Sequence, residues 1–150
     1  MNKQKYLEKH GFFIEDLVVG QEAKHEKKIL EKDIHDFSKI TGDNNPVHVD
    51  EEFAKFTIFK KKIAHGFLSG SLISTVIATK LPGPGSIYLN QSLKFLAPVF
   101  VNETVIAKVK IEEINLEKNK IKLLTECFIE KKKILTGIAE IMVSSRTKIG

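Results

Sequence analysis

Two side chains that can exchange protons near neutral pH, Asp43 and His48, lie five residues apart within the segment 41–50, which reads TGDNNPVHVD. The glycine and the proline of this segment disfavour a helix, its paired asparagines are typical of turns, and a proline favours an extended residue before it. We therefore expect an irregular, rigid loop here. Such a loop can point a carboxylate and an imidazole at the same small volume, as general acid–base catalysis requires.

Helices are expected on both sides of this loop. Apolar residues recur every three positions in 33–41, which predicts a helix that ends at Gly42. A short helix is expected at 51–59. Residues 67–79 contain no charge and are apolar nearly all round, a pattern typical of a buried helix. Glycines and prolines end it at 81–85, and at 13 residues it is too short to cross a membrane.

The rest of the chain predicts an antiparallel sheet. The mostly charged residues 21–30 indicate an edge strand. Four later segments alternate apolar and polar residues, and we assign strands to 87–99, 105–112, 121–129 and 134–143. Pro98 indicates a bend or a sheet edge. The chain 1–150 is therefore expected to be one α+β domain, with the polar residues 1–11 loosely ordered.

The composition restricts the class of partner. At 150 residues, 42% hydrophobic and 29% charged, the chain can bury the core of one soluble domain. Its net charge of +5 favours anionic partners, such as nucleic acid, a phosphorylated cofactor or an acidic carrier protein. Nucleic acid is not expected, because basic and aromatic residues are not interleaved and no recognition module is present. No apolar run is long enough to span a bilayer.

Cysteine usage points to a reducing compartment. The single cysteine, Cys127, excludes an internal disulfide and fits the cytoplasm. It lies in an alternating strand without a paired histidine, so we assign it to the core. The first residues are charged rather than apolar, and no secretion signal is expected. We therefore expect a cytoplasmic protein that does not bind membranes.

Three parts of the sequence together resemble the MaoC-like, (R)-specific enoyl-CoA hydratase family. They are Phe37-Ser38, the segment 41–50, and Ile63-Ala64-His65-Gly66, with Ala54, Thr57 and Phe59 between them. Glycine, aspartate, asparagine, proline and histidine in that order, followed downstream by alanine-histidine-glycine, form a specific motif. The resemblance covers most of the chain beyond its first dozen residues. Leu30 departs from it, since relatives often carry a capping hydroxyl there.

This resemblance implies a hot-dog fold, in which an antiparallel β-sheet wraps around a long central α-helix. It also implies a homodimer with the acyl pocket at the subunit interface. Asp43 and His48 would be the catalytic pair, and Gly66, at the start of the central helix, would offer its backbone N–H to the thioester carbonyl. Asn45 would shape the loop, and Ser74 would hydrogen-bond near Asp43.

The reaction implied by the resemblance is the reversible addition of water to a trans-2-enoyl-CoA, which gives an (R)-3-hydroxyacyl-CoA. One group takes a proton from water as its oxygen attacks C3, another delivers a proton to C2, and a donor stabilises charge on the thioester oxygen. Asp43 and His48 can supply the proton transfers in either order, since a close pair titrates as a unit. No metal or redox cofactor is expected: coenzyme A is part of the substrate, and no residue spacing resembles a metal site.

Each of these residues also has a structural interpretation. Asp43 could cap a turn, and His65 is expected to hold the loop with its ring rather than to transfer protons. Ser74 belongs to a stripe of small residues that includes Gly70, so close packing explains it as well as a supporting hydrogen bond does. The run Lys60-Lys61-Lys62 indicates a solvated turn, with a contact to the phosphates of coenzyme A as the alternative reading.

Other functions compete with the hydratase interpretation. Two enzymatic alternatives share the fold: dehydration of a 3-hydroxyacyl-[acyl carrier protein] by the same residues, and hydrolysis of the thioester. An alternative from another class is a non-catalytic acyl-CoA-binding or assembly subunit, which has no need for Asp43, His48 and Gly66. We therefore predict a cytoplasmic (R)-specific enoyl-CoA hydratase that binds an acyl-CoA thioester as a homodimer or a larger homo-oligomer.

Overall fold

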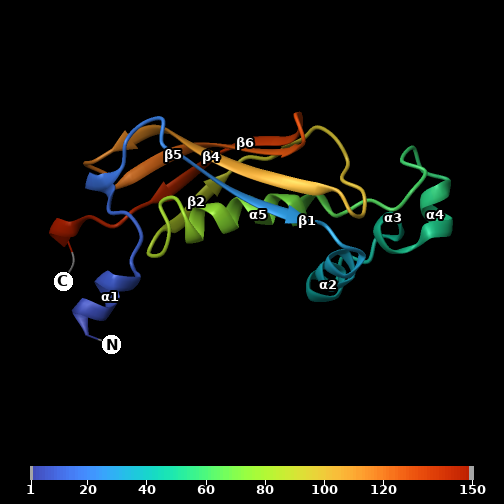
Figure 1. The fold of residues 1–150 in the computed structure, drawn as a ribbon, viewed down its shortest axis with the longest axis horizontal. Coiled ribbons are helices and arrows are strands. Elements are labelled where there is room, and N and C mark those ends of the chain that lie inside the picture. The colour runs from blue at the N-terminus through green and yellow to red at the C-terminus, as the bar shows by residue number, and fades with distance from the viewer. Residues whose placement is uncertain (1, 149–150) are drawn as a thin grey trace.

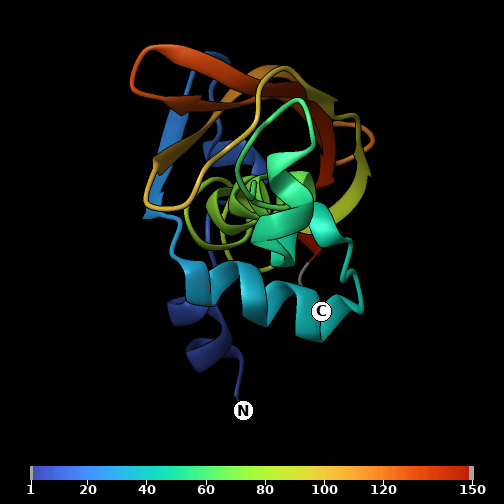
Figure 2. The ribbon, with the colours of Figure 1, turned by 90° about the vertical axis from the view of Figure 1, so that its right-hand side faces the viewer.

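A computed structural model describes residues 2–148 as a curved antiparallel sheet over one long helix, α5 (Figure 1). Viewed from the end that carries the short helices, the sheet arches over α5 (Figure 2). None of the helices in this range combines the length and the apolar character needed to cross a membrane. In chain order the elements are α1 (Lys3–Lys9), η1 (Ile14–Asp16), β1 (Glu22–Lys28), α2 (Glu31–Thr41), α3 (Pro46–Val49), α4 (Glu51–Lys55), α5 (Gly66–Thr79), β2 (Ile87–Gln91), β3 (Lys94–Phe95), β4 (Thr104–Asn115), β5 (Lys120–Ile129), β6 (Lys132–Met142) and η2 (Arg146–Lys148).

The sheet has six strands in the order β1-β4-β5-β6-β2, with β3 paired to β6. Every neighbouring pair is antiparallel. In β4 the side chains at alternate positions, from Val105 to Ile111, are fully buried, while those between them are partly exposed. One buried face therefore accounts for the alternation in the sequence, which confirms the predicted meander and the edge position of β1.

The region predicted as a single strand, 87–99, forms two short strands instead, so that prediction is wrong. Between β2 and β3 the hydroxyl of Ser92 accepts a hydrogen bond from the backbone N–H of Ile138 (2.9 Å). A side-chain oxygen thus takes the place of a backbone carbonyl, which interrupts the ladder. Pro98 lies further along, in the segment that leads to β4, as the predicted bend requires.

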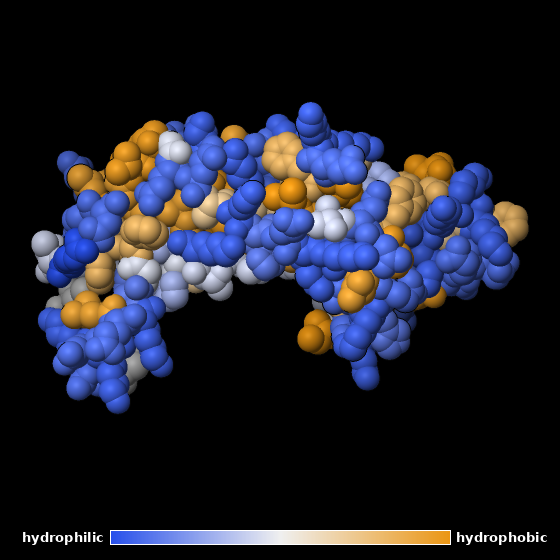
Figure 3. All heavy atoms as spheres, in the orientation of Figure 1, coloured by the Kyte–Doolittle hydropathy of each residue, from blue (hydrophilic) through white to orange (hydrophobic). Residues whose placement is uncertain are grey.

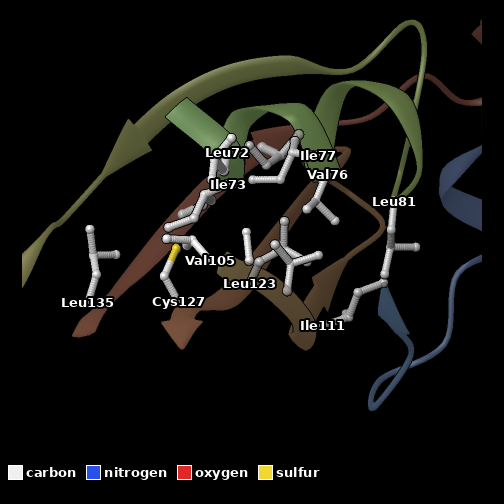
Figure 4. Close-up of a cluster of buried hydrophobic side chains, with 14 of the residues drawn as sticks. Leu72, Ile73, Val76, Ile77, Leu81, Val105, Ile111, Leu123, Cys127 and Leu135 are labelled. Carbon is white, nitrogen blue, oxygen red and sulfur yellow. The ribbon is translucent and has the colours of Figure 1, made fainter. Parts of the chain in front are cut away.

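Helix α5 places one apolar face against the sheet (Figure 4). The side chains of that face, all at most 7% exposed, are Leu72, Ile73, Val76 and Ile77. Ser74 and Ala78, on another face of the helix, are exposed. The helix is apolar as predicted, but the prediction that it is buried nearly all round is wrong for the single chain, because the sheet covers only one side of it.

The two predicted helices around the loop are present, with different bounds. α2 begins at Glu31 because the carboxylate of Asp33 accepts a hydrogen bond from the N–H of Leu30 (2.8 Å), one of the donors left free at a helix start. α4 is shorter than predicted. Beyond its end, the hydroxyl of Thr57 donates to the carbonyl of Ala54 (2.7 Å) and satisfies one of the last free acceptors.

The N-terminal segment contains a short helix, α1, where Asn2 accepts a hydrogen bond from the N–H of Lys5. The loose order expected for residues 1–11 stays a prediction, and Met1 lies outside the described residues. The chain after α1 is tied to the loop beyond α5, because Gly11 N–H donates to the carbonyl of Pro84 (2.8 Å). α1 lies at the end of the molecule opposite α3 and α4 (Figure 1).

The packing of α5 generates a prediction about stability. Ile73→Ala removes a side chain that is 0% exposed, so we expect the free energy of unfolding to fall by about 2–5 kcal/mol. Ile58→Ala is the matched control, because Ile58 is 88% exposed, and it should change stability by less than about 0.5 kcal/mol. Urea denaturation at one fixed protein concentration measures both. Equal losses in the two variants would contradict the packing described above.

Candidate active site

The loop that carries Asp43 is fixed where α2 ends. Gly42 caps the helix in the left-handed conformation (φ 79°), and its N–H donates to the carbonyl of Ser38. The hydroxyl of Thr41 donates to the carbonyl of Phe37 (2.7 Å) and accepts from the N–H of Asp43 (3.1 Å). The backbone of Asp43 is therefore positioned by the last turn of α2.

His48 lies on a one-turn helix, α3, and the prediction that segment 41–50 is irregular throughout is wrong. Asn45 caps this turn: its side-chain oxygen accepts from the N–H of Val47 (3.3 Å). Pro46 occupies the first helical position, where its missing N–H costs nothing and its fixed φ suits a helix. Asn45 therefore shapes the segment as a helix cap, and its own N–H donates to the Asp43 carboxylate (3.3 Å).

The hydrogen bond of His48 fixes its tautomer. Its Nδ1 lies 2.7 Å from the carbonyl oxygen of Ile63. Because a carbonyl can only accept, Nδ1 carries the hydrogen and donates, and in the neutral ring Nε2 keeps a free lone pair. His48 also lines the apolar cavity described below. The ring is thus arranged with an unprotonated nitrogen available to a substrate or to water.

The surroundings of His48 favour its neutral form. Burial lowers the pKa of His48 below its ordinary value of 6.5, and the neighbouring His65 adds to the lowering. The carbonyl of Ile63 and the charge of Asp43 act in the opposite direction on this pKa without reversing it. At neutral pH the ring is therefore a proton acceptor.

His65 joins the loop to the start of α5. Its ring is 2% exposed, and Nε2 donates to the backbone carbonyl of Asp43 (2.9 Å). The ring centroid lies 3.9 Å from that of His48, at an interplanar angle of 31°, and 4.8 Å from that of Phe37. His65 therefore touches both members of the expected catalytic pair, and its contacts are those of a residue that holds the loop.

Asp43, His48 and His65 converge. One side-chain N or O atom from each lies within 4.8 Å of the others. Within residues 2–148 this is the one group of histidine, cysteine and acidic side chains close enough to share a metal ion. One nitrogen of each ring already donates to a backbone carbonyl. What remains is the Asp43 carboxylate and one nitrogen on each ring, and a carboxylate close to an imidazole can serve as a proton-transfer pair.

A cavity of about 480 Å³ extends from His48 along the start of α5. Its walls are apolar except for the side chains of His48 and Ser69, which suits an acyl chain. The lining residues are His48, Phe59, Ile63, Ala64, Gly66, Phe67, Ser69, Phe95, Leu96, Ala97, Pro98, Val99, Ile134 and Leu135. Ser69 was not predicted as a site residue, although its spacing of three from Gly66 places both on one face of the helix.

Gly66 is the first residue of α5, and its N–H has no hydrogen-bond partner within the part of the chain that the structure describes. It lines the cavity together with His48. A Cβ atom at position 66 would lie 2.7 Å from the ring of Phe95, which is closer than carbon atoms can approach. Glycine at this position therefore leaves room for the aromatic ring of Phe95.

Ser74 and the lysine run lie apart from this cluster. Ser74 is exposed two turns further along α5, about 12 Å from Gly66 at 1.5 Å per residue. Within the described range 2–148 its side chain makes no hydrogen bond, to Asp43 or to any other residue. Lys60 and Lys61 are exposed, whereas Lys62 pairs with Glu31. Lys61 and Lys62 line a second hollow, which shares Phe59 with the apolar cavity.

Comparisons with known proteins find relatives of this chain among hydratases and dehydratases. The (R)-specific enoyl-CoA hydratase of Rhodospirillum rubrum is 46% identical over 134 residues, covering 89% of this chain and 93% of that protein. A mitochondrial 3-hydroxyacyl-[acyl-carrier-protein] dehydratase of Solanum lycopersicum is 37% identical, covering 74% and 67%.

A solved structure, the unliganded R-hydratase PhaJ1 from Pseudomonas aeruginosa, superposes with a TM-score of 0.85 at 42% identity, covering 91% of this chain and 88% of that one. The predicted fold, an antiparallel sheet around a central helix, is thereby confirmed. The family model described as MaoC like domain matches residues 17–131. This chain therefore belongs to the MaoC-like family of hot-dog proteins.

Proposed function

We infer that this chain is an (R)-specific 2-enoyl-CoA hydratase, a hydro-lyase that reversibly adds water to trans-2-enoyl-CoA to give (R)-3-hydroxyacyl-CoA. One observation carries the inference. The carboxylate of Asp43 and a ring nitrogen of His48 lie within 4.8 Å of each other, and His48 faces an apolar cavity beside the free amide of Gly66. The similarity to hydratases over nearly the whole chain supports it.

We propose that His48 is the base, because its Nε2 keeps a free lone pair. Nε2 accepts a proton from water as the water oxygen bonds to C3, and the π electrons of the C2–C3 bond move toward the thioester oxygen. The pair formed by protonated His48 and Asp43 then returns a proton to C2, so that the enzyme regains its starting state. Each such proton transfer contributes about 10²–10⁴ to the rate.

The thioester oxygen needs a donor while its charge grows. The amide of Gly66 meets this need, because it points away from the start of α5, where the helix dipole is positive. Asn45 and His65 support the pair by capping α3 and holding the Asp43 carbonyl. These steps involve no metal and no redox cofactor.

Coenzyme A is proposed to extend from the cavity toward the hollow lined by Lys61 and Lys62. The two spaces share Phe59, and Lys61 there can meet its phosphates. The hollow also contains Glu31, Glu51 and Glu103, and Lys62 is paired with Glu31. The net charge of +5 also suits an acidic acyl carrier protein, which makes the dehydration of a carrier-bound substrate the second candidate. We place the enzyme in the cytoplasm, in keeping with its one free, buried thiol at Cys127.

A homodimer is part of the proposal. β2 is an edge strand, and it exposes Ile87, Tyr88 and Leu89. The outer face of α5, with Ser74 and Ala78, is also uncovered. In Figure 3 the molecule is hollowed between the two lobes that contain α1 and α2. A second copy of the chain placed in this hollow would cover the outer face of α5 and approach its small side chains closely.

Removal of either proton-transfer group tests the mechanism. Asp43→Asn and His48→Asn should each lower kcat for hydration at least about 10²-fold, because each removes one step of the proton transfer. Loss of the conjugated-thioester absorbance of a 2-enoyl-CoA measures the rate, and the chirality of the product is determined in parallel.

The controls are Asp50→Asn and His25→Asn, which should keep wild-type rates. Asp50 caps α4, a role that asparagine also fills, and His25 lies in the edge strand β1. Near-normal turnover of either active-site variant would rule the mechanism out. Enoyl thioesters of coenzyme A and of acyl carrier protein, assayed side by side, separate the two candidate substrates, while release of free thiol would indicate a thioesterase.

The pH dependence of hydration should follow the protonation of His48. Since its pKa lies below 6.5, the neutral base persists as the solution becomes mildly acidic, and kcat/KM should fall only as the pH drops through that lowered value. The stability contributed by the neutral ring is lost over the same range. Proton NMR of the ring, assigned with His48→Asn, gives the midpoint directly. A midpoint at or above 6.5 would contradict the proposed role of burial.

Light scattering tests the dimer. The native mass should be twice 16.9 kDa, and Leu89→Lys should produce monomers, because a charge on the edge strand β2 opposes its pairing with a second copy. Leu116→Lys is the matched control, since Leu116 is 60% exposed in the turn after β4. An active monomeric wild-type protein would remove the homodimer from the proposal.

A further inference from the structure

The hydroxyl of Ser69 is buried without a hydrogen-bond partner. Ser69 lies on α5, and the residue is 3% exposed. Its backbone carbonyl accepts from the thiol of Cys127 (3.6 Å), but no group within residues 2–148 bonds to its Oγ. A buried polar group left unpaired destabilises the folded protein. Such an atom therefore indicates a partner that binds from outside the chain.

Helix α5 itself could satisfy this hydroxyl and does so for its neighbours. Ser71 donates to the carbonyl of Leu68 (2.6 Å), and Thr79 donates to that of Thr75 (2.6 Å). Hydroxyls in helices commonly take this option. Ser74 makes no such bond but is exposed to water. Ser69 is thus the residue of α5 whose hydroxyl is buried and makes no hydrogen bond within residues 2–148.

Ser69 is one of the residues that line the apolar cavity, together with His48 and Gly66. Residues three apart share a face of a helix, and helical side chains lean toward its N-terminus. The side chain of Ser69 therefore covers the first turn of α5, where the amide of Gly66 is also free. Two hydrogen-bond donors converge on the same part of the cavity.

We propose that Ser69 is a further catalytic residue, whose hydroxyl donates a hydrogen bond to the thioester oxygen beside the Gly66 amide. The proposal rests on the hydratase function given above. As the water oxygen bonds to C3, the C2–C3 π electrons form a C1–C2 double bond and the C1 oxygen becomes an enolate. Ser69 keeps its proton throughout and only donates to that oxygen.

Burial makes this donor effective. A hydroxyl without an internal acceptor gives up no hydrogen bond when the substrate binds, so it needs no rearrangement as the charge develops. The low polarity of the cavity walls strengthens the interaction further. The unpaired hydroxyl destabilises the free protein. When the enolate oxygen forms, it accepts the hydrogen bond and this destabilisation ends.

Ser69→Ala tests the proposal, with Ser71→Ala as the matched control on the same helix. In Ser69→Ala we expect kcat for hydration to fall at least about tenfold, toward the 10²–10³-fold known for loss of one oxyanion donor, while KM changes less than about twofold. The melting temperature should stay the same or rise, because an unsatisfied group is removed. Ser71→Ala should match the wild type in kcat and KM.

A bound-state spectrum gives an independent readout. The C1 carbonyl stretch of bound enoyl-CoA, labelled with ¹³C at C1, should lie at lower frequency in the wild type than in Ser69→Ala, because one polarising donor is lost. An unchanged kcat, a raised KM with unchanged kcat, or a melting temperature that falls in proportion to activity would each overturn the proposal. If the wild type hydrates no enoyl thioester, the hydratase function itself fails, which is a separate result.

Discussion

The hydrogen bond from the buried ring of His65 to the carbonyl of Asp43 ties the loop that carries Asp43 to the central helix. His65 directly precedes α5, so this one contact relates the end of α2 to the start of α5. The same ring lies against His48 and limits how that imidazole can turn. The relative placement of carboxylate, imidazole and helix amide therefore depends on a residue that is itself held in the protein interior.

Helix α5 packs against the sheet along most of its length and leaves hydrogen-bond donors free at its start. Its middle and end bury aliphatic side chains against β4 and β5, which fixes the helix on the sheet. Its first turn, by contrast, leaves Gly66 N–H and Ser69 Oγ without internal partners. Strong packing at one end thus allows unsatisfied donors to persist at the other, an arrangement expected where a site is prepared for a ligand.

Local chemistry made much of this molecule predictable. The buried faces of the strands explain why apolar and polar residues alternate along β4, β5 and β6, and the burial of α5 explains its uncharged run. The motif around Asp43 and His48 is specific enough to indicate the family. The prediction fails at Pro46, because proline ends a helix in its interior but begins one at the first position. The reach of His65 to Asp43, 22 positions away, and the burial of Ser69 depend on tertiary contacts that no local pattern encodes.

The close approach of the Phe95 ring to Gly66 has a consequence for how such sequences can diverge. Any side chain at 66 would have to displace that aromatic group, whereas a smaller residue at 95 would relax the restriction while widening the cavity wall. Substitutions at 66 and 95 are therefore expected to be energetically coupled, so that a side chain at 66 would be tolerated only beside a smaller residue at 95.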